Sequence, residues 1–189
     1  VVTDGEAGIM LESVARENRC SISGEIQGVH LQDAGKIYKV CEEILNDIFG
    51  RYDKICSVGV TGQMHGIVYL DQYGEAVSPL YTWQDRRGDR PFRGETYASW
   101  MSKRSGFSVS AGFGAVTHFY NKVNDLVPPE AKVFCTIPDY VVMRLAGRKA
   151  PMVHGSMAAS IGMFDSKSRR FDRTVIDGLG IDSSFFPEI

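Results

Sequence analysis

The sequence predicts an α/β domain, and three observations lead to this prediction. Apolar residues recur at spacings of three and four over 32–49, which is typical of an amphipathic helix. A short apolar run with β-branched residues follows at 55–60 and predicts a buried strand. Polar side chains then gather after two predicted strands, at 61–66 and 84–87. In α/β sheets, ligands bind at such strand ends.

The composition is that of an ordinary folded domain and argues against several classes of protein. Of the 189 residues, 43% are hydrophobic, which is ample for a core. The net charge is −2, so no overall basic field would hold nucleic acid or an anionic membrane. Neither a membrane span nor a signal peptide is recognisable. Four widely spaced cysteines without a C-x-x-C pair favour reduced thiols and a cytoplasmic location.

The first half of the chain predicts a hairpin, a helix and three strands. Residues 1–15 alternate apolar and polar side chains around Asp4, Gly5 and Glu6, which is the pattern of a β-hairpin with a very short first strand. We therefore expect the chain to begin inside a sheet. The further elements expected here are a helix over 32–49 and strands over 55–60, 67–71 and 78–83.

The second half predicts mainly helices. Pro128 and Pro129 stop the second of them, Pro138 lies in the first turn of the third, and Gly147 follows that helix. No closing element follows the last helix, so we expect a mixed sheet flanked by helices and incomplete at both ends. The expected helices are 93–103, 115–127, 137–145 and 173–179, with a strand at 132–135 and a glycine-rich irregular stretch at 105–114.

The loop 61–66 carries groups that suit a polyhydroxylated ligand. Gly62 and Gly66 allow sharp turns, Gln63 offers an amide, and His65 offers an imidazole that donates or accepts. The alternative is a hairpin corner in which His65 bonds only a backbone carbonyl, and spacing alone leaves both interpretations open.

A second polar cluster follows the strand at 78–83. Trp83 supplies an aromatic face beside Asp85, Arg86 and Arg87, and a sugar is bound by just such a face together with hydrogen-bonding groups. The alternative is that Asp85 caps the next helix while both arginines are solvated. Capping and binding could also coexist.

Other kinds of site are not indicated. The four histidines lack the i, i+4 spacing of a helical metal pair, so no metal site is predicted. Neither G-x-S-x-G nor a glycine-rich phosphate-binding motif occurs. If nucleotide chemistry takes place, its phosphate site is expected elsewhere.

Two segments, VGVTGQMHGIVYLD at 58–71 and SPLYTWQDRR at 78–87, resemble the N-terminal half of the FGGY family of carbohydrate kinases. The similarity continues through IPDYVVMRLAG at 137–147 and AASIGMFD at 158–165, so it covers nearly the whole chain. The G-Q-M-H-G loop is similar to that of xylulokinases and sedoheptulokinases, and GFGAVT at 112–117 is most similar to sedoheptulokinases.

This resemblance implies a ribonuclease-H-like, actin-like ATPase domain. The family has two such domains, the first holding the sugar and the second MgATP. Residues 1–189 would be the N-terminal, sugar-binding domain, without the first strand and its phosphate loop and without the C-terminal ATP domain. ATP and Mg²⁺ would be bound mostly by parts outside this chain. We expect this stretch alone to turn over nothing.

The resemblance also implies roles for particular residues. It places Gln63, Met64 and His65 against a ketose. Trp83 and the run 85–87 (Asp85, Arg86, Arg87) would line the same pocket or its edge. Two positions depart from the family, since Thr117 stands where many members have Lys and His154 stands where we align the catalytic Asp. A neutral His154 could accept the hydroxyl proton, and the alternatives are Asp85 or an acid outside this chain.

These considerations predict the sugar-binding part of an ATP-dependent kinase. It would phosphorylate the terminal primary hydroxyl of a ketose, sedoheptulose before xylulose, by in-line transfer. The partners expected are the ketose and neither nucleic acid nor membrane, with a homodimer left open. A non-catalytic sugar-sensing domain of the same fold is the alternative. An actin-like ATPase domain without a sugar is a third, which His65 and Trp83 argue against.

Overall fold

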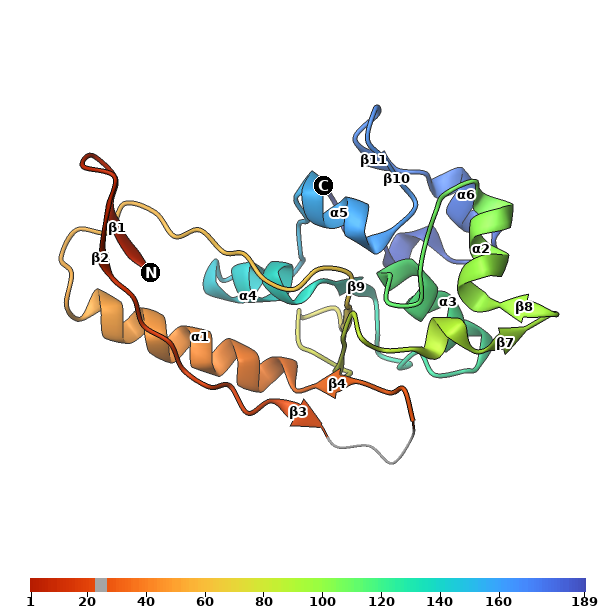
Figure 1. Ribbon diagram of the computed structural model, residues 1–189, viewed down its shortest axis with the longest axis horizontal. Helices are drawn as coiled ribbons and strands as arrows, with labels where there is room; N and C mark the ends of the chain where they lie inside the picture. Colours follow the sequence, from red (N-terminus) through yellow and green to blue (C-terminus); the bar gives the residue numbers. More distant parts are fainter. Residues whose placement is uncertain (23–26) are drawn as a thin grey trace.

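The structure is a computed structural model that describes residues 1–22 and 27–189. Figure 1 shows a long arm that leads into a rounded lobe, with the C-terminus on the lobe. The arm holds strands β1 (Val2–Asp4) and β2 (Ile9–Glu12) and helix α1 (Ala34–Phe49). The lobe holds helices α2 (Tyr97–Ser105), α3 (Gly114–Val123), α5 (Gly155–Ile161) and α6 (Arg173–Gly178).

The predicted N-terminal hairpin is confirmed. Strands β1 and β2 pair antiparallel, with Asp4 opposite Ile9. The Asp4 carboxylate accepts hydrogen bonds from the backbone N–H groups of Glu6 and Ala7, each at 2.9 Å. An aspartate that bonds the backbone two and three residues ahead closes a tight turn, which explains why the chain reverses here.

Helix α1 confirms the helix predicted from the apolar spacing. Asp33 is its N-cap, with the carboxylate accepting from the N–H of Lys36 at 2.9 Å. The helix packs against α4 (Ile137–Leu145), where the rings of Tyr38 and Tyr140 meet edge to face at 6.4 Å. This contact fastens the arm to the lobe.

The strand predicted at 55–60 is wrong. In the described part of the chain these residues pair with no strand, and Val58 and Val60 expose 48% and 38% of their surface. Their apolar, β-branched character gives strand propensity, but a strand forms only where a neighbour takes up the backbone hydrogen bonds. The run is extended and unpaired.

The ladders among the described residues are antiparallel. The chain pairs β3 with β4, β4 with β6, and β5 with β9, while single bridges join Ile67 to Tyr81 and, in parallel, Met152 to Glu188. The strands predicted at 67–71 and 78–83 are present but shorter than expected. The bounds are β3 (Ser21–Ile22), β4 (Leu31–Gln32), β5 (Val68–Leu70), β6 (Leu80–Tyr81) and β9 (Val133–Cys135).

The helix predicted over 93–103 begins later, at Tyr97. Arg93 and Gly94 both have positive φ angles, 50° and 83°, and form a hairpin turn between β7 (Pro91–Phe92) and β8 (Glu95–Thr96). A left-handed turn interrupts a helix. Thr96 then caps α2, and Gly106 ends it at φ 74°.

The remaining elements follow the predictions closely. Helix α4 has the predicted bounds, with Pro138 in its first turn. Helix α3 ends a turn earlier than predicted, and α6 confirms the last helix. The stretch 152–164 forms α5 and the start of a small hairpin. The strands of this hairpin are β10 (Phe164–Asp165) and β11 (Arg170–Phe171). The lobe also contains the 3-10 turns η1 (Arg87–Asp89) and η2 (Ser183–Phe185).

The core lies in the lobe and is rich in aromatic rings. Trp100 stacks on Phe119 at 5.1 Å, and Tyr69 meets Phe134 edge to face at 6.2 Å. A second cluster lies beneath α1 and α4 and includes Leu70 and Met143. Aromatic pairs in these geometries add packing energy beyond the area they bury.

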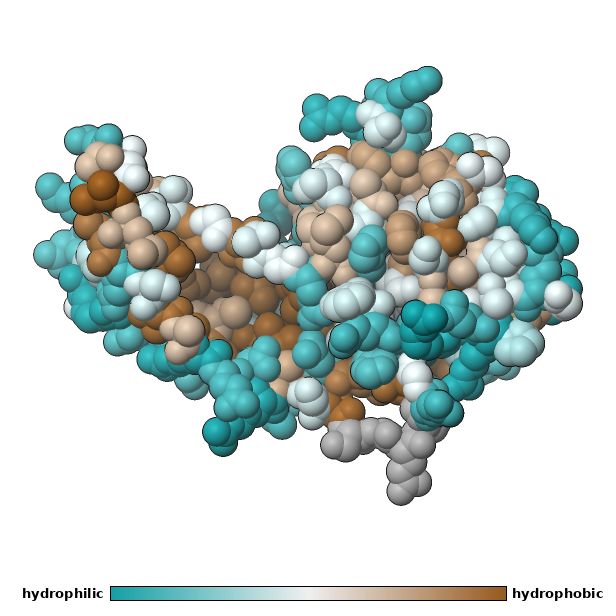
Figure 2. All heavy atoms as spheres, in the orientation of Figure 1, coloured by the Kyte–Doolittle hydropathy of each residue, from teal (hydrophilic) through white to brown (hydrophobic). Residues whose placement is uncertain are grey.

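The arm contributes far less to the core than the lobe. Figure 2 shows hydrophobic side chains over the hollow between the end of the arm and the lobe. In the hairpin, Ile9 and Met10 expose 54% and 65% of their surface. The lobe is therefore the part that builds the candidate site.

Candidate functional site

A cavity of about 740 Å³ opens on the lobe. Its wall is formed by residues from several parts of the chain: His30, His65, residues 110–113, and Trp83, Gln84, Arg86 and Asp89. Trp83 follows strand β6, and His65 precedes strand β5. The bridge between Ile67 and Tyr81 brings these two strand ends together. The loop 61–66 was expected to follow a strand at 55–60, which does not form, yet His65 and Trp83 line one cavity.

Glycines allow the walls of the cavity to touch at the backbone. A Cβ on Gly112 would overlap the Trp83 carbonyl, and one on Gly88 would lie 2.6 Å from the Cα of Ala111. A Cβ on Gly66 would lie 2.5 Å from the Tyr81 carbonyl oxygen. Side chains other than hydrogen would force these segments apart, so the glycines set the shape of the site.

Three residues predicted for the site lie together in the cavity wall: His65, Trp83 and Arg86. Trp83 leaves 52% of its surface exposed, which is a large aromatic face open to a ligand. The Nε of Arg86 forms an ion pair with Oδ2 of Asp89 at 2.6 Å. The backbone N–H of Arg86 donates to the Gly28 carbonyl at 2.7 Å. Aromatic, cationic and imidazole groups thus converge.

Asp85 lies beneath the cavity wall rather than in it, which corrects its predicted place. It is fully buried, and its Oδ1 accepts from the Nε of Arg87 at 2.7 Å while Oδ2 accepts from Nη2 at 3.1 Å. Oδ2 also accepts from the N–H of His30 at 3.2 Å. The carboxylate is fully occupied and fixes His30 against the segment 83–87.

Arg87 is likewise buried and continues inward through a chain of polar groups. Its guanidinium lies 4.2 Å from the ring centre of Tyr81 and donates to the side-chain oxygen of Asn121. The amide of Asn121 donates to the Tyr69 hydroxyl at 3.3 Å, and that hydroxyl is hydrogen-bonded with Nδ1 of His118 at 2.8 Å. This network supports the wall from below.

Burial governs the titration of this network. Desolvation raises the pKa of the Tyr69 hydroxyl and lowers the pKa of His118 to about 3. His118 is therefore a neutral imidazole near neutral pH. Its Nε2 and the hydroxyl of Thr117 have no hydrogen-bond partner among the described residues.

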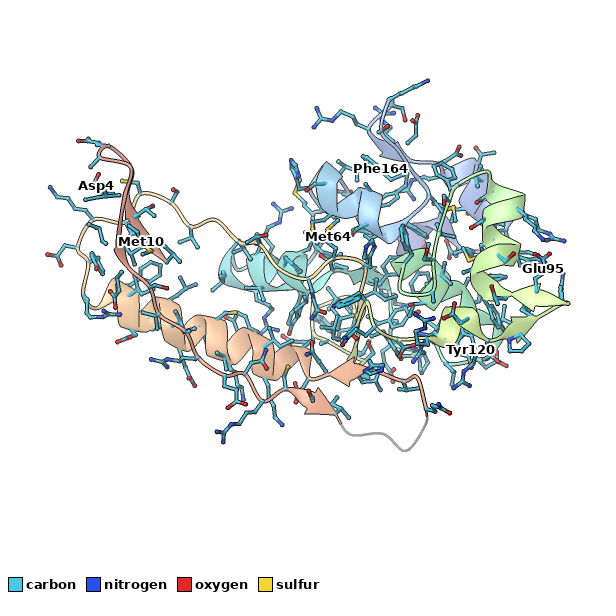
Figure 3. All side chains as sticks on the ribbon, viewed as in Figure 1. Asp4, Met10, Met64, Glu95, Tyr120 and Phe164 are labelled. Atoms are coloured by element: carbon cyan, nitrogen blue, oxygen red, sulfur yellow. The ribbon has the colours of Figure 1, made fainter. Side chains whose placement is uncertain are left out.

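The other residues predicted on the loop 61–66 lie outside the cavity wall. The amide of Gln63 donates to the side-chain oxygen of Gln32 at 2.8 Å, which ties the loop to β4. Met64 is 44% exposed and lies near α5, where Figure 3 labels it. Of this motif, His65 alone reaches the cavity.

His154 is not brought to the cavity. It is the N-cap of α5, an exposed side chain whose Nδ1 lies 2.9 Å from the hydroxyl of Ser156. Nearby Asp139 is buried at the start of α4, and desolvation raises its pKa to about 6. The geometry of this structure gives His154 a capping role.

Sequence reasoning missed several parts of the wall, including His30, Ser110 and Phe113. The glycine-rich stretch 105–114 was one available signal, since Gly112 marks a close backbone approach. Nothing local marks His30, because Asp85 positions it from a distant part of the chain.

The described residues contain neither a cluster of metal-binding side chains nor a membrane-spanning helix. Within 1–22 and 27–189, no three His, Cys, Asp or Glu side chains cluster as a metal would require. Of the helices that the structure describes, none is long and apolar enough to cross a membrane.

The fold is that of carbohydrate kinases of known structure. Xylulose kinase from Lactobacillus acidophilus superposes with a TM-score of 0.74 at 23% identity, over 90% of this chain and 35% of that one. Gluconate kinase from the same organism gives a TM-score of 0.73 at 22% identity, over 90% and 35%. The predicted α/β class of ribonuclease-H-like, actin-like type is confirmed.

The chain belongs to the FGGY family of carbohydrate kinases. The family model described as "FGGY family of carbohydrate kinases, N-terminal domain" matches residues 1–189 of the sequence. Sedoheptulokinase of Mus musculus is 30% identical over 96% of this chain and 41% of its own length. Sedoheptulokinase of Homo sapiens is 30% identical over 84% and 36%. The chain thus spans about two fifths of these relatives.

Proposed function

We propose that residues 1–189 are the N-terminal, sugar-binding domain of an ATP-dependent carbohydrate kinase. The acceptor is the terminal primary hydroxyl of a ketose, with sedoheptulose preferred and xylulose second. The observation that carries this proposal is the convergence of Trp83, His65 and Arg86 on one cavity. A half-exposed indole packs on the apolar face of a sugar, and the polar groups bond its hydroxyls.

The similarity to the relatives supports the proposed order of the two ketoses. Sedoheptulokinases match at 30% identity, whereas the xylulose kinase of Streptomyces rubiginosus matches at 26% over 70% of this chain. A glycerol kinase of Clostridium botulinum matches at 25%. A cavity of about 740 Å³ has room for a seven-carbon sugar.

The family resemblance implies that ATP and Mg²⁺ are bound mostly by parts outside this chain. The role proposed for this chain is on the sugar side, where it holds and orients the acceptor hydroxyl and shields it from water. Phosphoryl transfer depends chiefly on such positioning.

The location we propose is the cytoplasm, because all four cysteines are free thiols.

A coupled ATP-consumption assay on the full-length protein tests the proposal. Sedoheptulose, xylulose, ribulose and glycerol are compared at equal concentrations, with residues 1–189 alone as the inactive control. We expect turnover with sedoheptulose to exceed that with the other three. Turnover with glycerol alone would contradict the ketose assignment.

The second candidate is a non-catalytic sugar sensor, favoured by one observation. His154 stands where we align the catalytic-base Asp of the family, and it lies outside the cavity. In a sensor, sedoheptulose would raise the melting temperature of the full-length protein without any consumption of ATP. The same assay separates the two functions.

A further inference from the structure

The backbone of His65 has a conformation that a histidine rarely adopts. Its φ is +72°, in the left-handed region, which is unfavourable for a residue with a Cβ. The turn is needed because Gly66, the next residue, passes directly against the Tyr81 carbonyl. Such a conformation persists only where neighbouring groups hold it.

Ser160 holds this residue at two points. Its hydroxyl oxygen accepts from the His65 N–H at 3.2 Å, and its carbonyl oxygen lies 2.8 Å from His65 Nδ1. Ser160 is 2% exposed, and its own hydroxyl donates to the Met157 carbonyl at 2.7 Å. The hydroxyl hydrogen is thereby committed to Met157, which leaves a lone pair for the backbone of His65.

Phe113 fixes the remaining freedom of the imidazole. Its ring lies 4.4 Å from the imidazole, tilted by 34°. The ring is thus bonded at one nitrogen and packed on one face. Both neighbours come from the lobe, Ser160 from α5 and Phe113 from the N-cap of α3.

A carbonyl oxygen only accepts, so the contact with Ser160 requires a proton on Nδ1 of His65. In the neutral imidazole the other nitrogen, Nε2, is then a bare acceptor. None of the described residues bonds it, and His65 lines the cavity. We propose that Ser160 is a positioning residue that sets the tautomer of His65, so that Nε2 accepts a hydrogen bond from a ligand hydroxyl.

This inference rests on the proposed function for the identity of the ligand. It adds a requirement on the chemical group of the ligand that faces Nε2. At the point facing Nε2 the ligand must carry an O–H group. A carbonyl or ether oxygen there would meet a lone pair and be disfavoured. Replacing that hydroxyl by hydrogen or by O-methyl should therefore weaken binding about tenfold or more.

Nitrogen NMR of the full-length protein, labelled at histidine, tests the tautomer without any ligand. The resonances of His65 are assigned by their loss in His65→Gln. In mildly alkaline buffer we expect the proton on Nδ1, the minor form for a free imidazole. A neutral His65 with its proton on Nε2 would overturn the proposal.

The variant Ser160→Ala adds a functional test, with Ser156→Ala as the matched control on the same helix. Ser160→Ala removes the hydroxyl that holds the His65 backbone but keeps the carbonyl that requires the proton on Nδ1. We therefore expect the tautomer to stay and KM for the ketose to rise about fivefold to tenfold, with a smaller change in kcat. Ser156→Ala should leave KM unchanged, because Ser156 contacts His154 instead. An unchanged KM in Ser160→Ala would contradict a positioning role for Ser160.

These two readouts separate this proposal from the proposed function. If no sugar is phosphorylated but the wild-type tautomer is as expected, the kinase assignment fails and the structural role of Ser160 stands. If Ser160→Ala does not fold, the wild-type spectrum still decides the tautomer.

Discussion

The carboxylate of Asp85 receives the guanidinium of Arg87 side-on, with Oδ1 2.7 Å from Nε and Oδ2 3.1 Å from Nη2. Both side chains are buried, and the pair lies directly under the cavity wall that carries Trp83 and Arg86. Neighbouring residues of this segment therefore have different roles. The outward ones face the cavity, and the inward ones hold the segment in place.

Replacing Asp85 by Asn should destabilise the protein strongly. The change leaves the Arg87 guanidinium buried without a counter-ion, and losing one partner of a buried pair costs about 3–5 kcal/mol. Urea unfolding of the full-length protein measures the loss. Asp47→Asn is the control, because Asp47 pairs with Arg51 on an exposed surface, where an ion pair contributes at most about 1 kcal/mol. Equal losses in both variants would refute the structural role of the buried pair.

Gly112→Ala should deform the cavity. The added methyl would overlap the Trp83 carbonyl, so the segment 110–113 must move away from 83–89 at a cost of about 1–3 kcal/mol or more. We expect a lower melting temperature and weaker ketose binding. Gly178→Ala, where a Cβ would meet no atom within 4 Å, should leave both unchanged. Normal binding in Gly112→Ala would show that the close approach is dispensable.

His118 should make stability depend on pH in the acid range. Burial lowers the pKa of His118 from 6.5 to about 3. Between these two pH values the unfolded chain binds a proton at His118 and the folded chain does not. The stability is complete above pH about 6.5 and is lost toward pH about 3, by up to about 1.4 kcal/mol per pH unit. Unfolding followed against pH should show this slope reduced in His118→Gln. The slope should persist in His154→Gln, since that histidine is exposed.

Asp139 should act in the opposite direction over part of the same range. Burial raises its pKa from 3.8 to about 6, so its contribution to stability is complete below pH about 3.8 and is lost as the pH rises through about 6. We expect Asp139→Asn to remove this loss and to steepen the net rise of stability with pH in that window. Asp53→Asn, at an exposed position, serves as the control. A pH profile identical to the wild type would mean that Asp139 is not the group responsible.

The features that could be predicted from the sequence are those that local chemistry determines. Helix α4 has its predicted bounds because Pro138 starts it and the apolar spacing defines its face. Trp83 follows its strand as predicted, whereas His65 was expected after a strand at 55–60 and instead precedes β5. What could not be predicted depends on distant partners.

Three differences illustrate this dependence. Asp85 turns inward because Arg87 and the backbone of His30 occupy its carboxylate, which a run of polar residues does not reveal. Residues 55–60 have strand propensity, yet no described strand lies beside them to pair with. Ser160 reaches His65 across 95 positions of the sequence, so neither motif alone indicates the contact.

The central claim is that the cavity bearing Trp83 holds the ketose. Its most direct test is the affinity of the full-length protein for sedoheptulose, measured by titration calorimetry in the wild type and in Trp83→Ala. Tyr73→Ala is the matched control, an aromatic side chain that is 62% exposed on the turn after β5 and lies outside the cavity wall. We predict that Trp83→Ala weakens binding on the order of tenfold to a hundredfold with little loss of stability, while Tyr73→Ala binds like the wild type. Equal affinity in Trp83→Ala and the wild type would contradict the account.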